Sequence, residues 1–257
     1  MDHPSEPPRL QGAAHHHDTH IQPPAGRPSV STALVTGASR GLGLALARAL
    51  AQRGWRLVVD ARGAQQLEVA RAELAALTEV AALAGDVADE GHRGDLFEAA
   101  DGQLDLLVNN ASLLGPSPQP SLAHYPLDAL ERVHRVNLLA PLALIQLALP
   151  LLGPGGRVIN VTSDAAVEAY EGWGGYGSAK AGLEQLTSVL AAEQPQLRVY
   201  AVDPGDMNTQ MQQEAFPGED VSDRPPPEES VPGLLALIEG EWPSGRYHAR
   251  DLIPVTP

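Results

Sequence analysis

The chain has 257 residues with a formal net charge of −15, 43% hydrophobic residues and no cysteine. Its length fits one large α/β domain or two small ones. The negative charge disfavours nucleic acid and anionic membranes as partners, and the lack of cysteine excludes disulfides, thiol catalysis and thiolate metal sites. No apolar run reaches the ~18 residues of a membrane span. The first residues lack the features of a signal peptide, so we expect a cytoplasmic protein.

Residues 1–29 are rich in proline, histidine and polar residues and show no apolar period. This composition predicts a disordered tail that precedes the folded part. His15, His16, His17 and His20 lie close enough in sequence to chelate a metal ion. A flexible tail with incidental metal affinity is the simpler interpretation, and we predict no metal site in this protein.

From residue 30 onward, short apolar strands alternate with helices. The predicted strands cover residues 31–37, 55–62, 78–87, 105–112, 156–163 and 197–205. The predicted helices cover 38–54, a segment ending near 77, 89–100, 127–152 and 173–194. Five strand-then-helix units in a row predict a parallel, doubly wound sheet. Several of these strands are apolar throughout, as is typical of strands covered on both faces.

After residue 205 the chain becomes polar and rich in proline. Residues 206–232 predict an irregular segment, followed by a helix over about 228–239 and a strand over 245–251. We find no linker between two domains, so residues 30–257 are predicted to form a single domain. The irregular segment 206–232 is the candidate lid over a substrate.

The first strand–helix turn reads TGASRGLG (36–43). Gly37 permits a tight turn out of the strand, and Gly41 and Gly43 allow backbone and helix to approach a ligand and the sheet closely. The free amides at the start of the helix favour an anion. The spacing differs from the G-x-G-x-x-G fingerprint, and a glycine turn used only for packing is the alternative.

The end of the second strand indicates which dinucleotide would bind. NAD sites carry an acidic residue there, which accepts from the ribose 2′-OH. Here the position expected to face the ribose is Ala61, while Asp60 is expected on the opposite face because strand side chains alternate. Arg62 and Arg40 are suited to a 2′-phosphate. We therefore predict NADP rather than NAD, and the preference would reverse if Asp60 reached the ribose.

Three polar residues have a spacing that suits acid/base chemistry. Tyr176 and Lys180 at i and i+4 share one helix face, and an ammonium beside a phenol should lower the phenol pKa. Ser163, at a strand end, can hold a substrate oxygen against that phenol, although a turn cap is the simpler role for a serine there. Alone, this spacing occurs by chance in many helices.

In this order and at this spacing, these motifs resemble those of the short-chain dehydrogenase/reductase family. The residues that match its motifs are the turn 36–43, Asp86-Val87, Asn109-Asn110-Ala111-Ser112, Asn137, Ser163, Tyr176, Lys180, Pro204-Gly205, Met207 and Thr209. One position departs from the pattern, because Ser112 stands where the family has glycine. The resemblance covers roughly residues 30–250.

The resemblance implies a single Rossmann-type α/β domain, with a doubly wound parallel sheet of about seven strands and helices on both faces. It implies NADP as cofactor, NAD being the less favoured choice. The residues then expected to contact it are Gly37, Ser39, Arg40, Leu42, Gly43, Arg62, Asp86, Val87, Asn109, Ala111, Tyr176, Lys180, Pro204, Gly205, Met207 and Thr209. Asp86 and Val87 would contact adenine, and the residues from Pro204 onward the nicotinamide carboxamide.

The resemblance also implies hydride transfer between the nicotinamide and a carbonyl or secondary alcohol. Tyr176 would donate the proton in reduction, Lys180 would lower its pKa, Ser163 would orient the substrate, and Asn137 would hold a water through a distorted helix. The alternative for Asn137 is a buried helix kink without a catalytic part. A non-catalytic NADP-binding regulatory or structural protein, and an epimerase or lyase on the same scaffold, stay open.

The substrate is predicted to be a small carbonyl or alcohol compound. Met207, Met211 and Phe216 would form an apolar wall in the lid, which suggests a moderately apolar molecule. Four residues between the serine and the tyrosine either line the pocket or face solvent: Glu168, Tyr170, Glu171 and Trp173. Family resemblance also implies a homodimer or homotetramer, formed through the helices at about 127–152 and 173–194.

Overall fold

The computed structural model describes residues 30–252. The strands are β1 (Thr32–Val35), β2 (Arg56–Ala61), β3 (Val80–Ala84), β4 (Leu104–Asn109), β5 (Leu152–Val161), β6 (Arg198–Asp203) and β7 (Gly245–His248). The helices are α1 (Gly41–Gln52), α2 (Ala64–Ala75), α3 (Glu90–Ala99), α4 (Leu127–His134), α5 (Ala140–Ala148), α6 (Gly174–Glu193), α7 (Gln210–Ala215) and α8 (Val231–Glu239). The predicted tail 1–29, with His15, His16, His17 and His20, lies outside the described residues.

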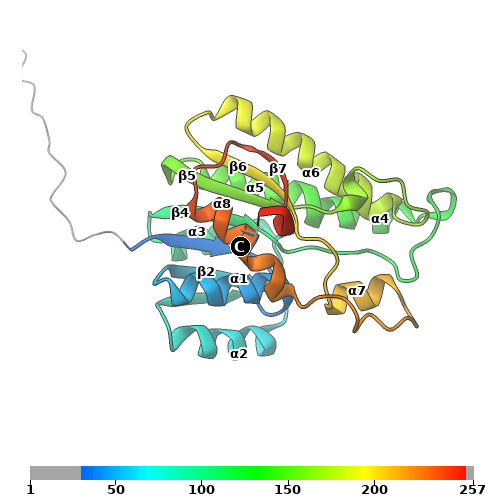
Figure 1. The fold of residues 1–257 in the computed structure, drawn as a ribbon, viewed down its shortest axis with the longest axis horizontal. Helices are drawn as coiled ribbons and strands as arrows, with labels where there is room; N and C mark the ends of the chain where they lie inside the picture. Colours follow the sequence, from blue (N-terminus) through cyan, green and yellow to red (C-terminus); the bar gives the residue numbers. More distant parts are fainter. Residues whose placement is uncertain (1–29, 253–257) are drawn as a thin grey trace, which may run out of the picture.

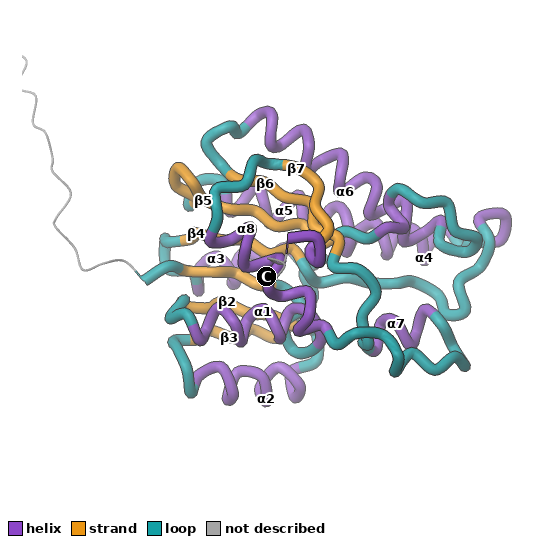
Figure 2. Tube along the Cα trace, viewed as in Figure 1, coloured by secondary structure: helices purple, strands orange, loops and turns teal. Residues whose placement is uncertain are grey.

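The strands form one seven-stranded parallel sheet in the order β3-β2-β1-β4-β5-β6-β7 (Figure 2). The chain winds outward from β1 to β3 and then returns to place β4 on the other side of β1. The connection that leaves β1 and the connection that leaves β4 therefore run in opposite directions across the sheet. In sheets of this kind ligands bind beyond the carboxyl ends of the strands at such a switch point. The predicted doubly wound α/β fold is confirmed.

Helices cover both faces of the sheet (Figure 1). Val35 and Val59 contribute to a core shared with α1, α2 and α8. Leu34 and Val58, one residue earlier in the same strands, contribute to a second core shared with α3, α5 and α6. All four side chains are fully buried. Alternating side chains thus bury both faces, which explains why these strands are apolar throughout.

The long helix predicted over 127–152 is interrupted. A π-helical turn, Arg135–Leu139, separates α4 from α5, and the helical run ends at Ala148. Asn137 lies inside this turn. The turn supplies the helix distortion expected at this asparagine, since single π turns occur mostly where a helix carries a functional residue.

The segment 206–232 is not wholly irregular, as its composition had predicted. It contains the short helix α7, which begins after Thr209, whose hydroxyl accepts a hydrogen bond from the backbone N–H of Gln212 at 3.3 Å. A side-chain cap of this kind, followed by good helix formers, explains the extra turn. The predicted last helix begins as a 3₁₀ turn, 227–230, and the predicted last strand ends at His248.

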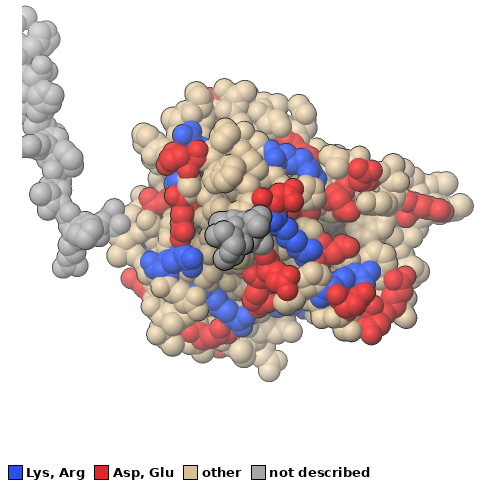
Figure 3. Space-filling model, viewed as in Figure 1, with Lys and Arg blue, Asp and Glu red and all other residues tan. Residues whose placement is uncertain are grey.

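Within residues 30–252, no helix is long and apolar enough to cross a membrane. On the face shown in Figure 3, basic side chains are interspersed with acidic ones. Several of these charges are paired within residues 30–252, as in the ion pair of Arg48 and Glu73 with an N–O distance of 2.5 Å. This visible face therefore presents no extended basic stripe of the kind that binds nucleic acid.

Candidate active site

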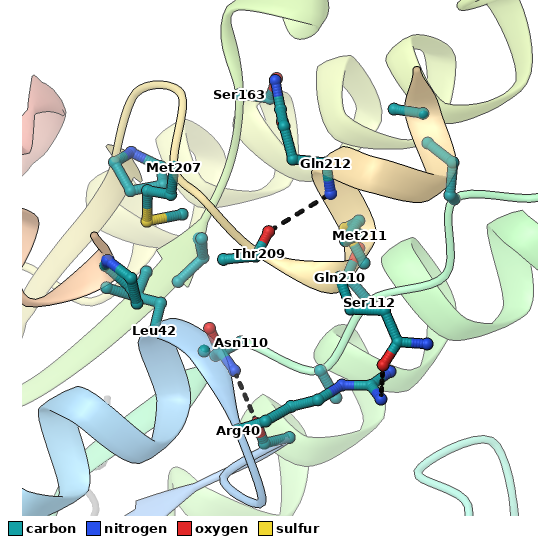
Figure 4. Close-up of a pocket in the computed structure, with 18 of the residues that line it drawn as sticks. Arg40, Leu42, Asn110, Ser112, Ser163, Met207, Thr209, Gln210, Met211 and Gln212 are labelled. Carbon is teal, nitrogen blue, oxygen red and sulfur yellow. Dashed lines mark hydrogen bonds between the residues drawn. The ribbon is translucent and has the colours of Figure 1, made fainter. Parts of the chain in front are cut away.

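A cavity of about 860 Å³ opens beyond the carboxyl ends of the strands, beside the switch between β1 and β4. Its volume is typical of ligand sites. It extends from the glycine turn to Tyr176, and Figure 4 shows part of its lining. Predicted site residues on its wall are Gly37, Ser39, Arg40, Leu42, Arg62, Asp86, Val87, Ala111, Ser163, Tyr176, Lys180, Pro204, Gly205, Met207 and Thr209.

The glycine turn after β1 is shaped by its backbone. Gly37 and Gly41 have φ values of +67° and +58°, a region that favours glycine. A Cβ at Gly37 would lie 2.9 Å from the Cα of Ala111. Gly43 does not line the cavity; a Cβ there would collide with the carbonyl oxygen of Gly37. Gly43 therefore serves the close packing of α1 on the turn, and its contact with a cofactor stays a prediction.

The two asparagines at the end of β4 point in different directions. Asn109 is 3% exposed and its Nδ2 donates to Oδ1 of Asn160 at 2.7 Å, within the core. Asn110 lines the cavity (Figure 4), and its Nδ2 donates to the carbonyl oxygen of Thr36 at 2.8 Å. The Asn109 side chain therefore points away from the cavity and Asn110 lies on its wall, because strand side chains alternate. Asn109 as a cofactor contact stays a prediction.

The end of β2 carries an acidic residue that borders the cavity but whose side-chain oxygens bond within the protein. Asp60 is 1% exposed, and its Oδ1 accepts the backbone N–H of Gly37 at 2.7 Å. Its Oδ2 lies 3.1 Å from Nε2 of His92. Ala61 and the exposed Arg62 also line the cavity. Both oxygens of Asp60 are thus engaged in contacts within the protein.

Tyr176 and Lys180 are both buried, as their positions on α6 suggest. Nζ of Lys180 donates to the carbonyl oxygen of Val161 at 2.8 Å and lies 5.4 Å from the centroid of the Tyr176 ring. Burial raises the pKa of Tyr176 to about 12 and lowers the pKa of Lys180 to about 8. The predicted lowering of the phenol pKa by Lys180 is therefore wrong for this structure, since burial raises that pKa and the Lys180 ammonium donates to Val161 instead.

Ser112, the residue that departs from the family pattern, contacts two candidate catalytic residues. Its Oγ donates to Oδ1 of Asn137 at 3.2 Å. The polar Ser112 hydroxyl beside Tyr176 lowers the pKa of that phenol, partly offsetting burial. Asn137 is fully buried, does not line the cavity, and also donates to the carbonyl oxygen of Leu113 at 2.8 Å. Its carboxamide thus holds the loop after β4.

Ser163 lines the cavity and also caps a turn. Its Oγ donates to Oδ1 of Asp164 at 2.8 Å and accepts the backbone N–H of Ala165 at 3.2 Å. The second oxygen of Asp164 accepts from the hydroxyl of Tyr170 at 3.0 Å. The cap contact and the position on the cavity wall occur together, so the two roles considered for this serine are compatible.

The segment before α6 divides into residues inside and outside the cavity. Trp173 lines it and packs edge-on against Tyr176, with ring centroids 5.8 Å apart. Glu168 and Glu171 do not line it, and Tyr170 is 47% exposed. The pocket-lining interpretation therefore holds for one of these four residues.

The lid segment contributes apolar and amide side chains. Met207 and Met211 line the cavity, whereas Phe216 packs against the Trp173 ring at a centroid distance of 5.9 Å. Arg40, from the glycine turn, donates to Oε1 of Gln210 on α7 (Figure 4). This contact joins the anion-binding turn to the lid, which no local sequence pattern indicated.

We expect the buried Lys180 to make stability depend on pH. Its folded pKa of about 8 lies below the ordinary value of 10.5. Between these values the unfolded chain holds a proton that the folded chain has lost, so the free energy of unfolding rises with pH. The expected rise is on the order of 2 kcal/mol. Urea unfolding of the wild type and of Lys180→Met, at about pH 8 and about pH 10, measures the part of this rise that Lys180 causes. The same pH dependence in both proteins would contradict the prediction.

Comparisons with known proteins agree with this geometry. A family model described as short chain dehydrogenase matches residues 31–220. A Saccharomyces cerevisiae benzil reductase ((S)-benzoin forming) is 33% identical over 193 residues, 70% of this chain and 73% of its own. A Pseudomonas aeruginosa rhamnolipids biosynthesis 3-oxoacyl-[acyl-carrier-protein] reductase is 35% identical over 191 residues, 70% and 73% of the two chains. A Shigella flexneri short chain dehydrogenase complexed with NADP superposes with a TM-score of 0.77 at 27% identity, covering 86% of this chain and 97% of its own.

Proposed function

The chain belongs to the short-chain dehydrogenase/reductase family, and we propose that it transfers hydride between NADP(H) and a carbonyl or secondary alcohol substrate, with Tyr176 as the acid/base. It is an oxidoreductase of that family. The observation that carries the proposal is a single cavity. This cavity joins the anion-binding turn at Gly37 to the buried Tyr176 and Lys180.

The walls of this cavity fit a phosphorylated dinucleotide. The turn at Gly37 and Gly41 presents backbone amides to an anion. Arg62 lines the cavity without an ion pair or hydrogen bond of its side chain to any residue in 30–252, and it would hold a 2′-phosphate. Asp86 and Val87 would flank the adenine, and Pro204 and Gly205 the nicotinamide end. A bound NADP(H) would supply or accept the hydride. The Shigella flexneri protein complexed with NADP supports this choice of cofactor.

Side chains of the protein would carry out the proton transfer. In reduction the Tyr176 hydroxyl would protonate the oxygen that becomes the alcohol, as a positioned general acid. Ser163 would turn its hydroxyl from Asp164 to the same oxygen and orient it. Lys180, charged below its pKa of about 8, would turn its ammonium from the carbonyl oxygen of Val161 toward the phenolate that remains and stabilise it. Asn137 would keep the loop at Leu113 and Ser112 in place.

The proposed substrate is a small, moderately apolar carbonyl compound. Leu114, Trp173 and Met211 pack with Tyr176 and give the cavity an apolar wall there, and Met207 adds an apolar side chain elsewhere in the lining. Both relatives named above are reductases of carbonyl compounds by their names. Hydrophobic walls with a few polar groups are typical of such sites.

Alternative functions on this fold have less support. A non-catalytic NADP-binding protein would be expected to lose its proton donor, yet Ser163, Tyr176 and Lys180 all line the cavity.

We also propose that the protein forms a homodimer or homotetramer. Leu127, Leu139 and Leu147, on the helical run from α4 to α5, are each more than 40% exposed. Apolar side chains in such numbers on one helical run are typical of an interface.

The proposed activity predicts that the protein oxidises NADPH when a suitable carbonyl compound is present. The test follows NADPH absorbance across a panel of aldehydes, ketones and quinones, with protein-free reactions as controls. We expect turnover with apolar ketones or diketones. A panel in which NADPH binds but no compound is reduced, and no alcohol is oxidised with NADP, would contradict the proposed reaction and favour a non-catalytic binding role.

A further inference from the structure

A buried histidine lies directly beneath the glycine turn. His92, in the first turn of α3, is 8% exposed, and its backbone N–H is capped by the carboxylate of Asp89 at 2.8 Å. Its Nε2 lies 3.1 Å from Oδ2 of Asp60, and the other oxygen of Asp60 accepts the N–H of Gly37 at 2.7 Å. Imidazole, carboxylate and turn amide thus form one chain of hydrogen bonds that ends at the proposed phosphate site.

The space for this ring is provided by a glycine. A Cβ at Gly85 would collide with the His92 imidazole. Gly85 lines the same cavity immediately before Asp86 and Val87, the residues proposed to flank adenine. The ring therefore packs between the ends of β2 and β3, close to the proposed cofactor on its protein side.

The charge of Asp60 makes a partner necessary. A carboxylate that is 1% exposed is costly unless it is paired. A free negative charge behind the turn would also repel the phosphates of a dinucleotide. Three carboxylates raise the pKa of His92: Asp60 on β2, Asp95 within α3 and Asp89, which caps the N-terminus of α3. The hydrogen bond to Asp60 is the main cause that raises the pKa of His92, and burial opposes it.

We propose that His92 is a positioning residue for the cofactor: its imidazolium neutralises the Asp60 carboxylate that holds Gly37, and so maintains the affinity of the turn for phosphate groups. This inference rests on the proposed cofactor but not on the proposed reaction. Above the raised pKa of His92 the pair carries a net negative charge. Affinity for the anionic dinucleotide therefore falls as pH rises through that pKa.

Three variants separate charge from packing. His92→Phe keeps the ring but removes the partner of Asp60; we expect the Kd for NADPH, measured by titration calorimetry, to rise about tenfold. In Asp60→Asn/His92→Phe the charge is absent, and the Kd should return to within about threefold of wild type. Adenosine, which has no phosphate, should bind all variants alike. A double variant that stays weak, or a matching loss for adenosine, would show that the ring acts by packing and would overturn the inference.

The single variant Asp60→Asn provides a pH test, which also serves if His92→Phe does not fold. Its side-chain oxygen keeps an acceptor for the N–H of Gly37. The wild-type affinity for NADPH, relative to Asp60→Asn at the same pH, should fall about tenfold from about pH 6 to about pH 9. Comparison at equal pH cancels the titration of the 2′-phosphate. A constant ratio would overturn the inference. If no protein bound NADPH or NADH at any pH, the proposed function itself would fail.

Discussion

Replacement of Tyr176 by phenylalanine is expected to lower kcat about a thousandfold and to leave the Kd for NADPH within about threefold of wild type. A positioned general acid contributes roughly 10²- to 10⁴-fold to a rate. The phenol is the buried acidic group on α6 that lines the cavity, and phenylalanine preserves its edge-on packing against Trp173. Steady-state kinetics with the ketone found in the panel, and calorimetric titration with NADPH, measure the two quantities.

Tyr247→Phe is the matched control for this change. Tyr247 lies on β7, outside the cavity, and its hydroxyl donates to the carbonyl oxygen of Pro243 at 2.8 Å. It should keep wild-type kcat and Kd. If Tyr176→Phe retained full activity, the assignment of the proton donor would be wrong. A joint loss of kcat and NADPH binding would instead indicate that the phenol is needed for the shape of the site.

Replacement of Arg62 by alanine is expected to raise the Kd for NADPH about thirtyfold and the Kd for NADH less than about threefold. A charge-assisted hydrogen bond is worth about 2 kcal/mol, which corresponds to this factor. Arg62 is exposed at the end of β2 and lines the cavity. Asp60 also borders the cavity, but its carboxylate oxygens already bond to Gly37 and His92, so we expect Arg62 rather than Asp60 to select between the two dinucleotides. Fluorescence or calorimetric titration with each dinucleotide measures the effect.

Arg71→Ala controls for the loss of one positive charge. Arg71 lies on α2, outside the cavity, and pairs with Glu68 at 2.6 Å. Its removal should change the affinities for NADPH and NADH equally and slightly. Equal losses for the two dinucleotides in Arg62→Ala would exclude a specific 2′-phosphate contact. That result would move the expected contact to Arg40, which currently donates to Gln210.

Much of the fold could be predicted because its signals are local. Short apolar runs that alternate with helical periods specify strands covered on both faces, and the observed parallel sheet follows from their order. The glycines of the first turn are required by backbone geometry at Gly37 and Gly41. The spacing of Tyr176 and Lys180 places them on one side of α6, and both line the cavity.

Features of the site that depend on contacts between distant segments could not be predicted in this way. His92 and Asp60 are 32 residues apart in the chain, and only the packing of α3 beside β2 brings them together. The pKa of Tyr176 depends on how deeply α6 is buried, which the lysine spacing does not report. Local pattern therefore determined which elements form and which residue types they carry. Tertiary packing decided which charged groups pair and which ionisable groups are buried, because the energies of burial and pairing depend on neighbours that are remote in sequence.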